Sequence, residues 1–366
     1  MGAVSLNATN RVLLEVKGLK TYFPLEEGTV RAVDGADFVI ERGKTLAVVG
    51  ESGCGKSVTA QSILRIVPPP GRIIEGELIY HRYSEDKTSF AMADVIDLTK
   101  LDPRGPEIRA IRGNEIAMVF QEPMTSLSPV HTMGNQIMET IMLHQQVSKA
   151  EARERAIDIL ARVGMPRPSI SVDAYPFELS GGMRQRGMIA MALSCQPSLL
   201  IADEPTTALD VTTAAQILDL MRELQEEMGM AIHYITHDLG VVAEMADNAV
   251  VMYLGKVVEE ADVDSLYYNP LHPYTRALLR SIPRITEDRR QWLEAIKGMV
   301  PDPYNLPSGC PFHPRCMQAG PECSEMDPPW IEAETGHWVR CVLYGEGASR
   351  SDTGRSEHHD QAYGER

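Results

Sequence analysis

Gly50-Glu51-Ser52-Gly53-Cys54-Gly55-Lys56-Ser57 is the stretch of this 366-residue chain that decides its fold. It fits the pattern G-x-x-x-x-G-K-[ST], in which the glycines let backbone N–H groups turn toward phosphate oxygens. In that pattern Lys56 reaches the β- and γ-phosphates of a nucleotide, and the hydroxyl of Ser57 binds Mg²⁺. The stretch therefore predicts a binding site for a nucleoside triphosphate with its magnesium ion.

The residues on either side predict a strand before the glycine stretch and a helix after it. Thr45–Val49 is a nearly continuous apolar run, typical of a strand that is covered on both faces. Residues 56–67 have apolar side chains at helical spacing, and we expect this helix to end where prolines and a glycine follow at 68–71. A loop between a strand and a helix is a good phosphate site, because the helix N-terminus adds positive potential.

Strands and helices alternate farther along the chain, which predicts an α/β domain with a largely parallel sheet. We expect strands at 115–120, 198–203 and 231–236, and helices at 180–192, 212–228 and 239–246. The stretch from 130 to 195 is helical and interrupts the alternation, so we place an inserted helical subdomain at about 124–195. Residues 81–97 are polar and mixed, and we expect them to form an exposed insertion.

A second buried strand is followed by two carboxylates. Residues 199–204 read Leu-Leu-Ile-Ala-Asp-Glu, and open α/β sheets bind ligands at the ends of their strands. We expect Asp203 to hold Mg²⁺ and Glu204 to polarise the attacking water as the general base. An acidic turn in solvent would explain these residues if they stood alone. Beside a phosphate loop they predict hydrolysis of the nucleotide.

Three further pieces complete the pattern. Residues 179–186 read Leu-Ser-Gly-Gly-Met-Arg-Gln-Arg, a glycine turn at a helix start that can also bind phosphate through Ser180 and nearby N–H groups. Gln121 follows the strand at 117–120, and His237 follows the strand at 231–236. Each piece alone has an ordinary structural explanation. The order and spacing of all five pieces carry the prediction.

With these five motifs, residues 11–264 resemble the ATP-binding subunits of ABC transporters, in which the glycine turn at 179–186 is the family's signature (the signature turn). The resemblance implies the P-loop NTPase fold of an ABC ATPase and a head-to-tail dimer with a second ATPase subunit. Ser180, Gly181 and Gly182 would then contact ATP on the partner's phosphate loop, and Asp210 would lie across the dimer seam. Since neither the glutamate nor the histidine of the family pattern is missing, we expect active hydrolysis once the partner supplies its own signature.

The same resemblance assigns further contacts to the nucleotide. His237 would contact the γ-phosphate, and Gln121 would touch Mg²⁺ or the lytic water. An aromatic ring stacks on adenine in this family, and we prefer Phe23 with Tyr22 as the alternative, although packing in a sheet would explain either ring.

The expected site residues form three sets. The catalytic residues are Glu204, His237 and Gln121. The magnesium ligands are Ser57, Gln121 and Asp203. The residues that bind ATP are Phe23, Gly50, Glu51, Ser52, Gly53, Cys54, Gly55, Lys56, Ser57, Gln121, Asp203, Ser180, Gly181, Gly182 and Asp210.

Residues 269–279, Asn-Pro-Leu-His-Pro-Tyr-Thr-Arg-Ala-Leu-Leu, resemble the oligopeptide/dipeptide/nickel branch of these ATPases, which carries a cysteine-bearing C-terminal extension. We place a small, irregular domain at 265–345 and a disordered tail at 346–366. Four of the six cysteines lie in this extension, at Cys310, Cys316, Cys323 and Cys341. In a reducing compartment such a cluster favours metal binding over disulfides.

The spacing of the four cysteines does not choose the metal. The gaps of five, six and seventeen residues match neither the bacterial ferredoxin run nor the paired C-x₂-C of zinc ribbons. The resemblance favours a [4Fe–4S] cluster of structural rather than electron-transferring role. One Zn²⁺ ion and free thiols remain as alternatives.

The function implied is the energising of di- or oligopeptide import, with nickel and oligosaccharides as alternative cargo. Partners would be a second ATPase subunit, two transmembrane permease subunits and, indirectly, an external substrate-binding protein. No apolar window approaches eighteen residues, so we expect a peripheral protein at the cytoplasmic face of the membrane.

Two other functional classes stay open. A soluble ABC ATPase of repair or translation typically has a long coiled coil or two ATPase domains, neither of which this sequence contains. The net charge of −16 also disfavours a nucleic-acid partner, because binding to the phosphate backbone depends on clustered Lys and Arg. A redox- or metal-sensing module is compatible with the cysteines, but the full hydrolytic set makes it secondary.

Overall fold

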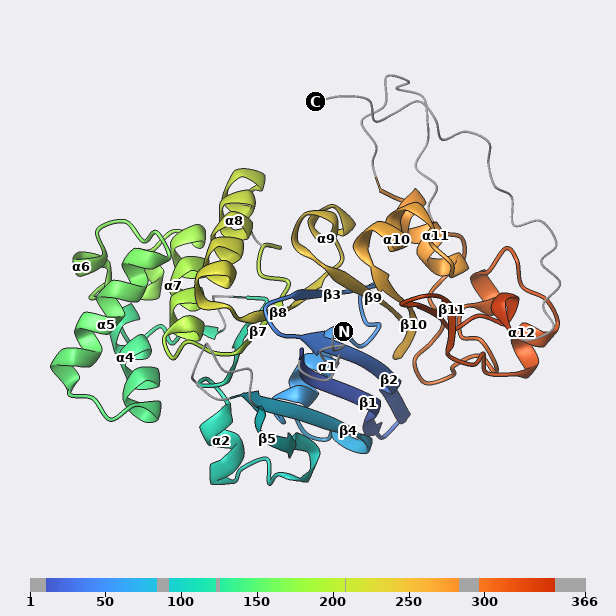
Figure 1. The fold of residues 1–366 in the computed structure, drawn as a ribbon, viewed down its shortest axis with the longest axis horizontal. Coiled ribbons are helices and arrows are strands. Elements are labelled where there is room, and N and C mark those ends of the chain that lie inside the picture. The colour runs from blue at the N-terminus through green and yellow to red at the C-terminus, as the bar shows by residue number, and fades with distance from the viewer. Residues whose placement is uncertain (1–10, 84–91, 123–125, 208, 283–295, 346–366) are drawn as a thin grey trace, which may run out of the picture.

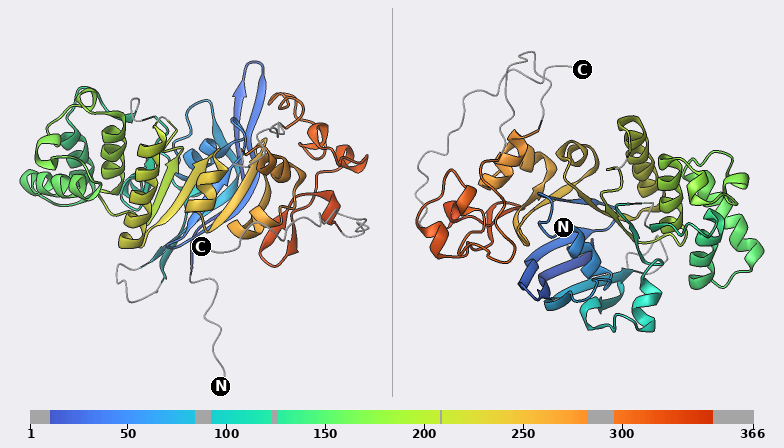
Figure 2. Two further views of the ribbon diagram at one scale, coloured as in Figure 1. Left: turned by 90° about the horizontal axis from the view of Figure 1, so that it is seen from above. Right: turned by 180° about the vertical axis from the view of Figure 1, so that it is seen from behind.

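The computed structural model describes residues 11–83, 92–122, 126–207, 209–282 and 296–345. The tail at 346–366, for which disorder is expected, lies outside the described residues. Within the described part, a mixed central sheet carries a smaller antiparallel sheet on one face, and helices lie around the central sheet and at its two ends (Figures 1 and 2).

The central sheet has eight strands among the described residues, in the order β11-β12-β10-β9-β3-β8-β7-β6. Its parallel part consists of β3 (Thr45–Val49), β6 (Ile116–Val119), β7 (Leu199–Asp203), β8 (Ala231–Thr236) and β9 (Asn248–Tyr253). Every residue of β3, β7 and β8 is buried, because both faces of the sheet are covered. The expected α/β fold with a largely parallel sheet is therefore confirmed.

A second sheet packs against one face of the first. It is antiparallel, in the order β2-β1-β4-β5, with β1 at Val12–Leu25, β2 at Gly28–Glu41, β4 at Arg72–Tyr83 and β5 at Met92–Asp97. The helix α1 (Lys56–Ile63) lies between the two sheets, and one buried apolar cluster joins all three layers. The loop at 50–57 is thereby fixed between β3 and α1.

Two local expectations are wrong. Residues 81–97 are not simply an exposed insertion, because 81–83 and 92–97 belong to β4 and β5; residues 84–91 lie outside the described residues. Helix α1 ends at Ile63 rather than at 67, since Leu64 caps it and Arg65 has a left-handed φ of 56°. The prolines at 68–70 therefore do not end this helix.

A helical group occupies one end of the molecule, at the β6–β7 side of the sheet (Figure 1). It contains α4 (Met133–His144), α5 (Lys149–Arg162), α6 (Pro168–Ser171) and α7 (Gly181–Leu193), and is followed by β7 and α8 (Val211–Met228). The side chains of Thr132, Ser148 and Ser180 accept hydrogen bonds from the N–H groups three residues later and so start α4, α5 and α7. A buried apolar cluster continues from these helices into β6, β7 and α8.

The C-terminal residues lie at the opposite end (Figure 1). After β10 (Lys256–Asp262) come α10 (Val263–Tyr268), α11 (Pro273–Arg280), α12 (Glu322–Glu325), β11 (Ile331–Glu334) and β12 (His337–Val339). Because β12 pairs antiparallel with β10, the hairpin β11–β12 extends the central sheet. The expected domain boundary at 264 thus lies within continuous packing and stays a prediction.

The remaining elements are short. They are α2 (Pro106–Ile111), α9 (Leu239–Met245) and the 3-10 turns Leu98–Lys100, Pro176–Glu178, His313–Arg315 and Val342–Tyr344. Of the helices in the described ranges, none has the length and apolar character needed to span a bilayer.

Candidate nucleotide-hydrolysis site

The loop at 50–57 requires glycine at two close backbone contacts. A Cβ atom on Gly50 would lie 2.2 Å from the carbonyl oxygen of Met252, and a Cβ atom on Gly55 would lie 2.2 Å from that of Ala32. Lys56 is buried, and its Nζ donates to the carbonyl oxygens of Gly50 at 2.8 Å and Glu51 at 3.2 Å. The loop therefore encloses an ammonium group at the start of α1.

Ser57 and Asp203 lie together at the expected magnesium position. The Ser57 hydroxyl donates to Oδ1 of Asp203 at 3.0 Å, which joins the start of α1 to the end of β7. Asp203 is buried, and this burial raises the pKa of its carboxyl group, to which the neighbouring Glu204 adds; Ser57 and Lys56 act in the opposite direction. A buried carboxylate destabilised in this way favours a cation as its partner.

Three loops converge on the carboxylate of Glu204. Gln121, after β6, donates from Nε2 to Oε2 at 3.1 Å, and Nδ1 of His237, after β8, lies 3.1 Å from Oε1. Thr207, which the sequence did not single out, donates from Oγ1 to Oε2 at 3.0 Å. The strands β6, β7 and β8 are parallel neighbours, so their carboxyl ends meet at one edge of the sheet.

The signature turn and Asp210 form a separate group. Ser180 accepts a hydrogen bond from the N–H of Met183, and Asp210 accepts from the N–H and the hydroxyl of Thr213 at the start of α8. A Cβ atom on Gly182 would lie 2.7 Å from the methyl group of Thr213, so the starts of α7 and α8 pack closely. Figure 1 shows α7 in the helical group and α1 below the middle of the sheet. The phosphate loop and the signature turn therefore lie in different regions of the chain.

The two candidate rings for adenine point to opposite sides of β1. The ring of Phe23 covers Gly71, where a Cβ atom would lie 2.4 Å from it. The hydroxyl of Tyr22 donates to Asp34, and the N–H of Asp34 donates to Gly255, whose own N–H donates to Cys54 of the phosphate loop. Tyr22 is therefore the ring that hydrogen bonds connect to the loop.

The four C-terminal cysteines line one cavity, together with residues that include His272, Phe312 and His313. All four are free thiols. Burial raises the pKa of Cys310 to about 11 and that of Cys341 to about 12, and the neighbouring thiols add to both shifts. Among the described residues, no three His, Cys, Asp or Glu side chains are arranged to hold a single metal ion.

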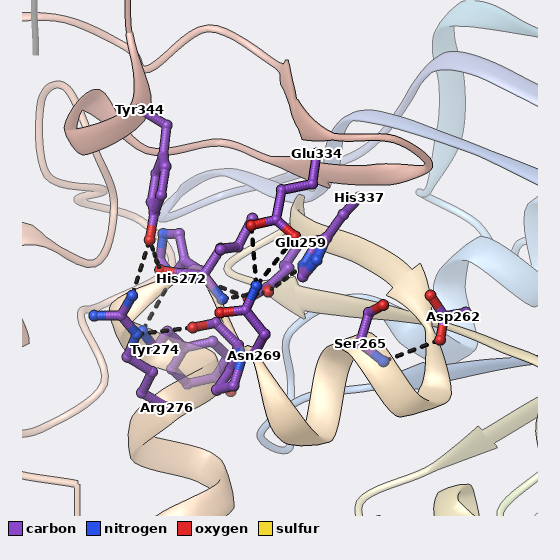
Figure 3. A network of polar contacts seen from close by, with 12 residues as sticks. Glu259, Asp262, Ser265, Asn269, His272, Tyr274, Arg276, Glu334, His337 and Tyr344 are labelled. Atoms are coloured by element: carbon purple, nitrogen blue, oxygen red, sulfur yellow. Dashed lines mark hydrogen bonds and ion pairs between the residues drawn. The ribbon is translucent and has the colours of Figure 1, made fainter. Parts of the chain in front are cut away.

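A buried polar network connects the sheet to the C-terminal residues (Figure 3). Glu259 of β10 is fully buried and accepts hydrogen bonds from the N–H groups of Leu271 at 2.6 Å and His272 at 2.8 Å. Its Oε1 also lies 2.8 Å from Nε2 of His337 in β12. The hydroxyl of Tyr344 donates to the carbonyl oxygen of Leu271. Local sequence gives no signal for these partners, because they meet only through the fold.

Two family models match the chain. The model described as "ABC transporter" matches residues 33–207, and the one described as "Oligopeptide/dipeptide transporter, C-terminal region" matches residues 258–323. The chain is 51% identical over 341 residues to the oligopeptide transport ATP-binding protein AppD of Bacillus subtilis, covering 93% of this chain and 99% of that protein. It is 44% identical over 329 residues to the dipeptide transport ATP-binding protein DppD of Escherichia coli, covering 90% and 96% respectively.

Solved structures agree with the fold. A dimeric, post-hydrolysis ATP-binding cassette, MJ0796 bound to ADP and Pi, superposes with a TM-score of 0.58 at 27% identity, covering 69% of this chain and 99% of that one. A further dimeric structure of MJ0796, a bacterial ABC transporter cassette, gives the same values.

Proposed function

The chain belongs to the ATP-binding subunits of ABC transporters of the oligopeptide and dipeptide importer type, and on that basis we propose how its residues drive import. It is an ATPase whose hydrolysis of ATP supplies energy for the transport of di- or oligopeptides. The observation that carries the catalytic assignment is the meeting of Gln121 and His237 on the carboxylate of Glu204, next to the Ser57–Asp203 pair.

Glu204 is the general base in this proposal. It accepts a proton from the water that attacks the γ-phosphate. Gln121 and His237 hold its carboxylate in place, and they contact the water and the γ-phosphate, respectively. Lys56 neutralises negative charge on the phosphates. Ser57 and Asp203 would hold Mg²⁺, which would offset the negative charge that develops during phosphoryl transfer. Ser57 and Asp203 fit this ion because they present a hydroxyl and a carboxylate oxygen 3.0 Å apart at a buried position.

The substitution Glu204→Gln tests this assignment, because it keeps the shape of the side chain and removes the basic oxygen. In the assembled transporter we expect phosphate release to fall at least about 100-fold, the usual contribution of a general base, while Mg·ATP stays bound. Glu227→Gln on α8 is the control, since Glu227 makes an exposed ion pair with Arg162. Phosphate release at the wild-type rate from the Glu204→Gln protein would remove Glu204 from the mechanism.

We propose further that the complete ATP site contains two chains. The separation of the signature turn from the phosphate loop supports a head-to-tail dimer in which Ser180, Gly181, Gly182 and Asp210 act on ATP held by the partner. We expect ATP to promote dimerisation of the Glu204→Gln protein with the partner ATPase. When Ser180→Arg is added to this protein, ATP should no longer promote dimerisation. Light scattering with and without Mg·ATP measures this, and ATP-independent association would contradict it.

Measurements of ATP binding can decide whether Phe23 or Tyr22 stacks on adenine. The hydrogen-bonded connection of Tyr22 to the phosphate loop supports Tyr22 over our first preference, Phe23, whose ring packs on Gly71. We expect Tyr22→Ala to weaken ATP binding more than Phe23→Ala, and Phe23→Ala to lower mainly the melting temperature. Titration of each variant with ATP distinguishes them, and the reverse order would restore Phe23.

We propose that the four cysteines hold a [4Fe–4S] cluster, with one Zn²⁺ ion as the alternative. Four thiols line one cavity, and Cys310, Cys323 and Cys341 are buried there. Burial and the neighbouring thiols raise the pKa of Cys310 and of Cys341, so ionised sulfurs at these positions need a positively charged group to stabilise them. A single zinc ion needs its sulfur ligands within a tetrahedron of 2.3 Å bonds, whereas a cluster takes one cysteine at each of four separate irons. The resemblance of the C-terminal extension to the oligopeptide/dipeptide branch is what favours the cluster over zinc.

Iron and sulfide analysis of anaerobically purified protein, with its visible spectrum, tests the cluster. We expect about four irons and four sulfides per chain, lost on Cys341→Ser and retained on Cys195→Ser, since Cys195 lies outside the cavity. A colourless protein, whether loaded with zinc or free of metal, would reject the cluster.

The remaining proposals concern partners and place. Relatives of this chain are named as peptide transport ATP-binding proteins. We therefore propose that its partners are two transmembrane permease subunits, a second and related ATPase chain, and an external substrate-binding protein that acts through the permeases. The chain would then lie at the cytoplasmic face of the membrane. Uptake of labelled di- and oligopeptides by vesicles with the assembled transporter tests the cargo, and uptake of nickel or oligosaccharides alone would replace it.

A further inference from the structure

An arginine of the C-terminal extension contacts the phosphate loop directly. Nη1 and Nη2 of Arg315 lie 2.6 Å and 3.0 Å from the two carboxylate oxygens of Glu51, a two-pronged ion pair across 264 positions of sequence. Glu51 is the second residue of the glycine stretch, directly after Gly50. The extension is thus in contact with the segment that holds the phosphates of ATP in the proposed function, on which this inference rests.

The ion pair is sheltered and well defined. The side chain of Arg315 is 4% exposed and that of Glu51 is 27% exposed. Arg315 also donates from Nη1 to the hydroxyl of Tyr253, at the end of β9, and from Nε to the carbonyl oxygen of Lys297. A planar guanidinium held at three points is pre-organised for a carboxylate, so the direction of the Glu51 side chain is fixed.

The backbone of Glu51 is held as firmly as its side chain. Its N–H donates to the hydroxyl of Tyr274 in α11 at 2.9 Å, and its carbonyl oxygen accepts from Nζ of Lys56 at 3.2 Å. Tyr274 is fully buried. Residue 51 therefore has contacts at its N–H, its carbonyl and its carboxylate, two of which come from residues C-terminal to 270.

The segment that carries Arg315 also carries two of the four cysteines. Cys310 and Cys316 bracket it, and between them the ring of Phe312 lies 5.3 Å from the ring of Tyr253 and 5.3 Å from that of Tyr274. Phe312 also lines the cysteine cavity. The aromatic cluster thus joins the cavity to the two tyrosines that contact Arg315 and Glu51.

We propose that Arg315 is a positioning residue for the phosphate loop and that its charge neutralises Glu51. Without Arg315, the carboxylate of Glu51 would stand unneutralised beside the triphosphate and would repel it, and the loop would lose one of its fixed points. The C-terminal extension is then part of the ATP-binding apparatus, acting through one ion pair and the tyrosine hydroxyl next to it.

The test measures binding of Mg·ATP under non-hydrolysing conditions, in the full-length chain carrying Glu204→Gln. Arg315→Gln is expected to raise the Kd about tenfold, within the usual range of coupling between sites. Arg315→Lys keeps the positive charge but loses one of the two hydrogen bonds to Glu51, so its Kd should lie between those of the parent chain and Arg315→Gln. Adding Glu51→Gln to Arg315→Gln should bring the Kd back to within about threefold of the parent, because the repelling charge is gone.

The rescue by Glu51→Gln separates this role from a structural one. Arg340→Gln is the matched control: Arg340 lies in the same extension, donates to the carbonyl oxygen of Val257 and lies 5.5 Å from the ring of Trp330. It should lower stability without changing the Kd. Hydrogen exchange at 50–57 should rise in Arg315→Gln and not in Arg340→Gln.

Three results would overturn the inference. They are an unchanged Kd in Arg315→Gln, the same loss in Arg340→Gln, or no recovery in the double variant. A failure of the parent chain itself to bind Mg·ATP would instead refute the proposed function, so the two failures are distinguishable.

Discussion

Glu204 has a backbone conformation that matches its proposed work. Its φ is +44°, in the left-handed region, which costs a non-glycine residue about 1–2 kcal/mol. Its N–H donates to the carbonyl oxygen of Ile235 in β8, so the neighbouring strand holds the turn in place. Strain of this kind is typical of functional positions, because it aims a side chain that a relaxed loop would leave mobile.

His233 provides a prediction on pH. It lies fully buried in β8, neither ring nitrogen has a hydrogen-bond partner among the described residues, and burial lowers its pKa to about 4. In the unfolded chain the pKa returns to about 6.5, so below that pH the unfolded state binds the extra proton and stability falls until about pH 4. Between pH 7.5 and 5.5 this residue should lower the free energy of unfolding by about 1 kcal/mol.

Urea unfolding at the two pH values measures this contribution. We expect His233→Leu to reduce the pH dependence by that amount, because an apolar side chain of similar size takes no proton. His131→Gln, at an exposed position, should leave it unchanged. An identical pH dependence in His233→Leu and wild type would show that His233 does not titrate in this range.

The sequence predicted that the residues around Glu204 follow strands and belong to one site, but it did not predict which side chains contact one another. Gln121, His237 and the two carboxylates follow neighbouring strands, and the parallel sheet brings strand ends together. Arg315 could not be paired with Glu51 in advance, since nothing near either residue indicates the other. Such a contact depends on the full path of the chain.

At the scale of elements, two helix glycines give a matched pair of substitutions. A Cβ atom on Gly134 of α4 would lie 2.6 Å from the carbonyl oxygen of Val172. On Gly187 of α7 its three nearest atoms would all belong to the side chain of Met133, with the terminal methyl nearest at 2.6 Å. Intrinsic helix preference favours alanine at both positions by up to about 1 kcal/mol. A backbone clash cannot be relieved by a rotamer change, but methionine can move.

We therefore expect Gly134→Ala to lower the free energy of unfolding by about 2 kcal/mol and Gly187→Ala to change it by less than about 1 kcal/mol. Thermal or urea unfolding of the two variants measures the difference. Equal effects would mean that the contact of α4 with Val172 adjusts freely.

The wrong expectation of an exposed insertion at 81–97 has a physical cause. Residues 81–82, at the end of β4, are polar, yet Arg82 pairs with Glu115 through two hydrogen bonds of 2.7 Å and 2.8 Å and lies two residues after the buried Tyr80. An antiparallel sheet with one covered face admits such side chains, and a polar stretch read by itself resembles a loop. The buried runs of β3, β7 and β8 had no such ambiguity.

At the scale of the whole molecule, Glu259 joins the central sheet to the extension. Its carboxylate accepts from the N–H groups of Leu271 and His272 and contacts His337. Glu259→Ala would leave these buried groups unsatisfied, so we expect a loss of about 3–5 kcal/mol, as for breaking a buried pair.

Glu334→Ala is the comparison for this prediction. Glu334 accepts from the side chain of Asn269 at an exposed position, and its removal should cost less than about 1 kcal/mol. Calorimetry of both variants measures the two losses, and a small loss for Glu259→Ala would show that water satisfies the freed groups.

The overall architecture was predictable from alternation and motif order, while the seating of the extension was not. The sequence indicated an irregular region after residue 264, because proline and cysteine are frequent there. Its hairpin β11–β12 is short, with two to three paired positions per strand, and only the edge of β10 gives it a place in the sheet. A strand that depends on a distant partner has little signal of its own.

The contact between Arg315 and Glu51 also has a consequence for protein synthesis. The ribosome adds roughly 5–20 residues per second, so the phosphate loop emerges roughly 13–50 s before the arginine that completes it. If Arg315 positions this loop as proposed, we expect a nascent chain whose ATPase core has already folded to hold ATP weakly until residue 315 has been added. The same weak binding is expected of chains that are cut short before residue 315.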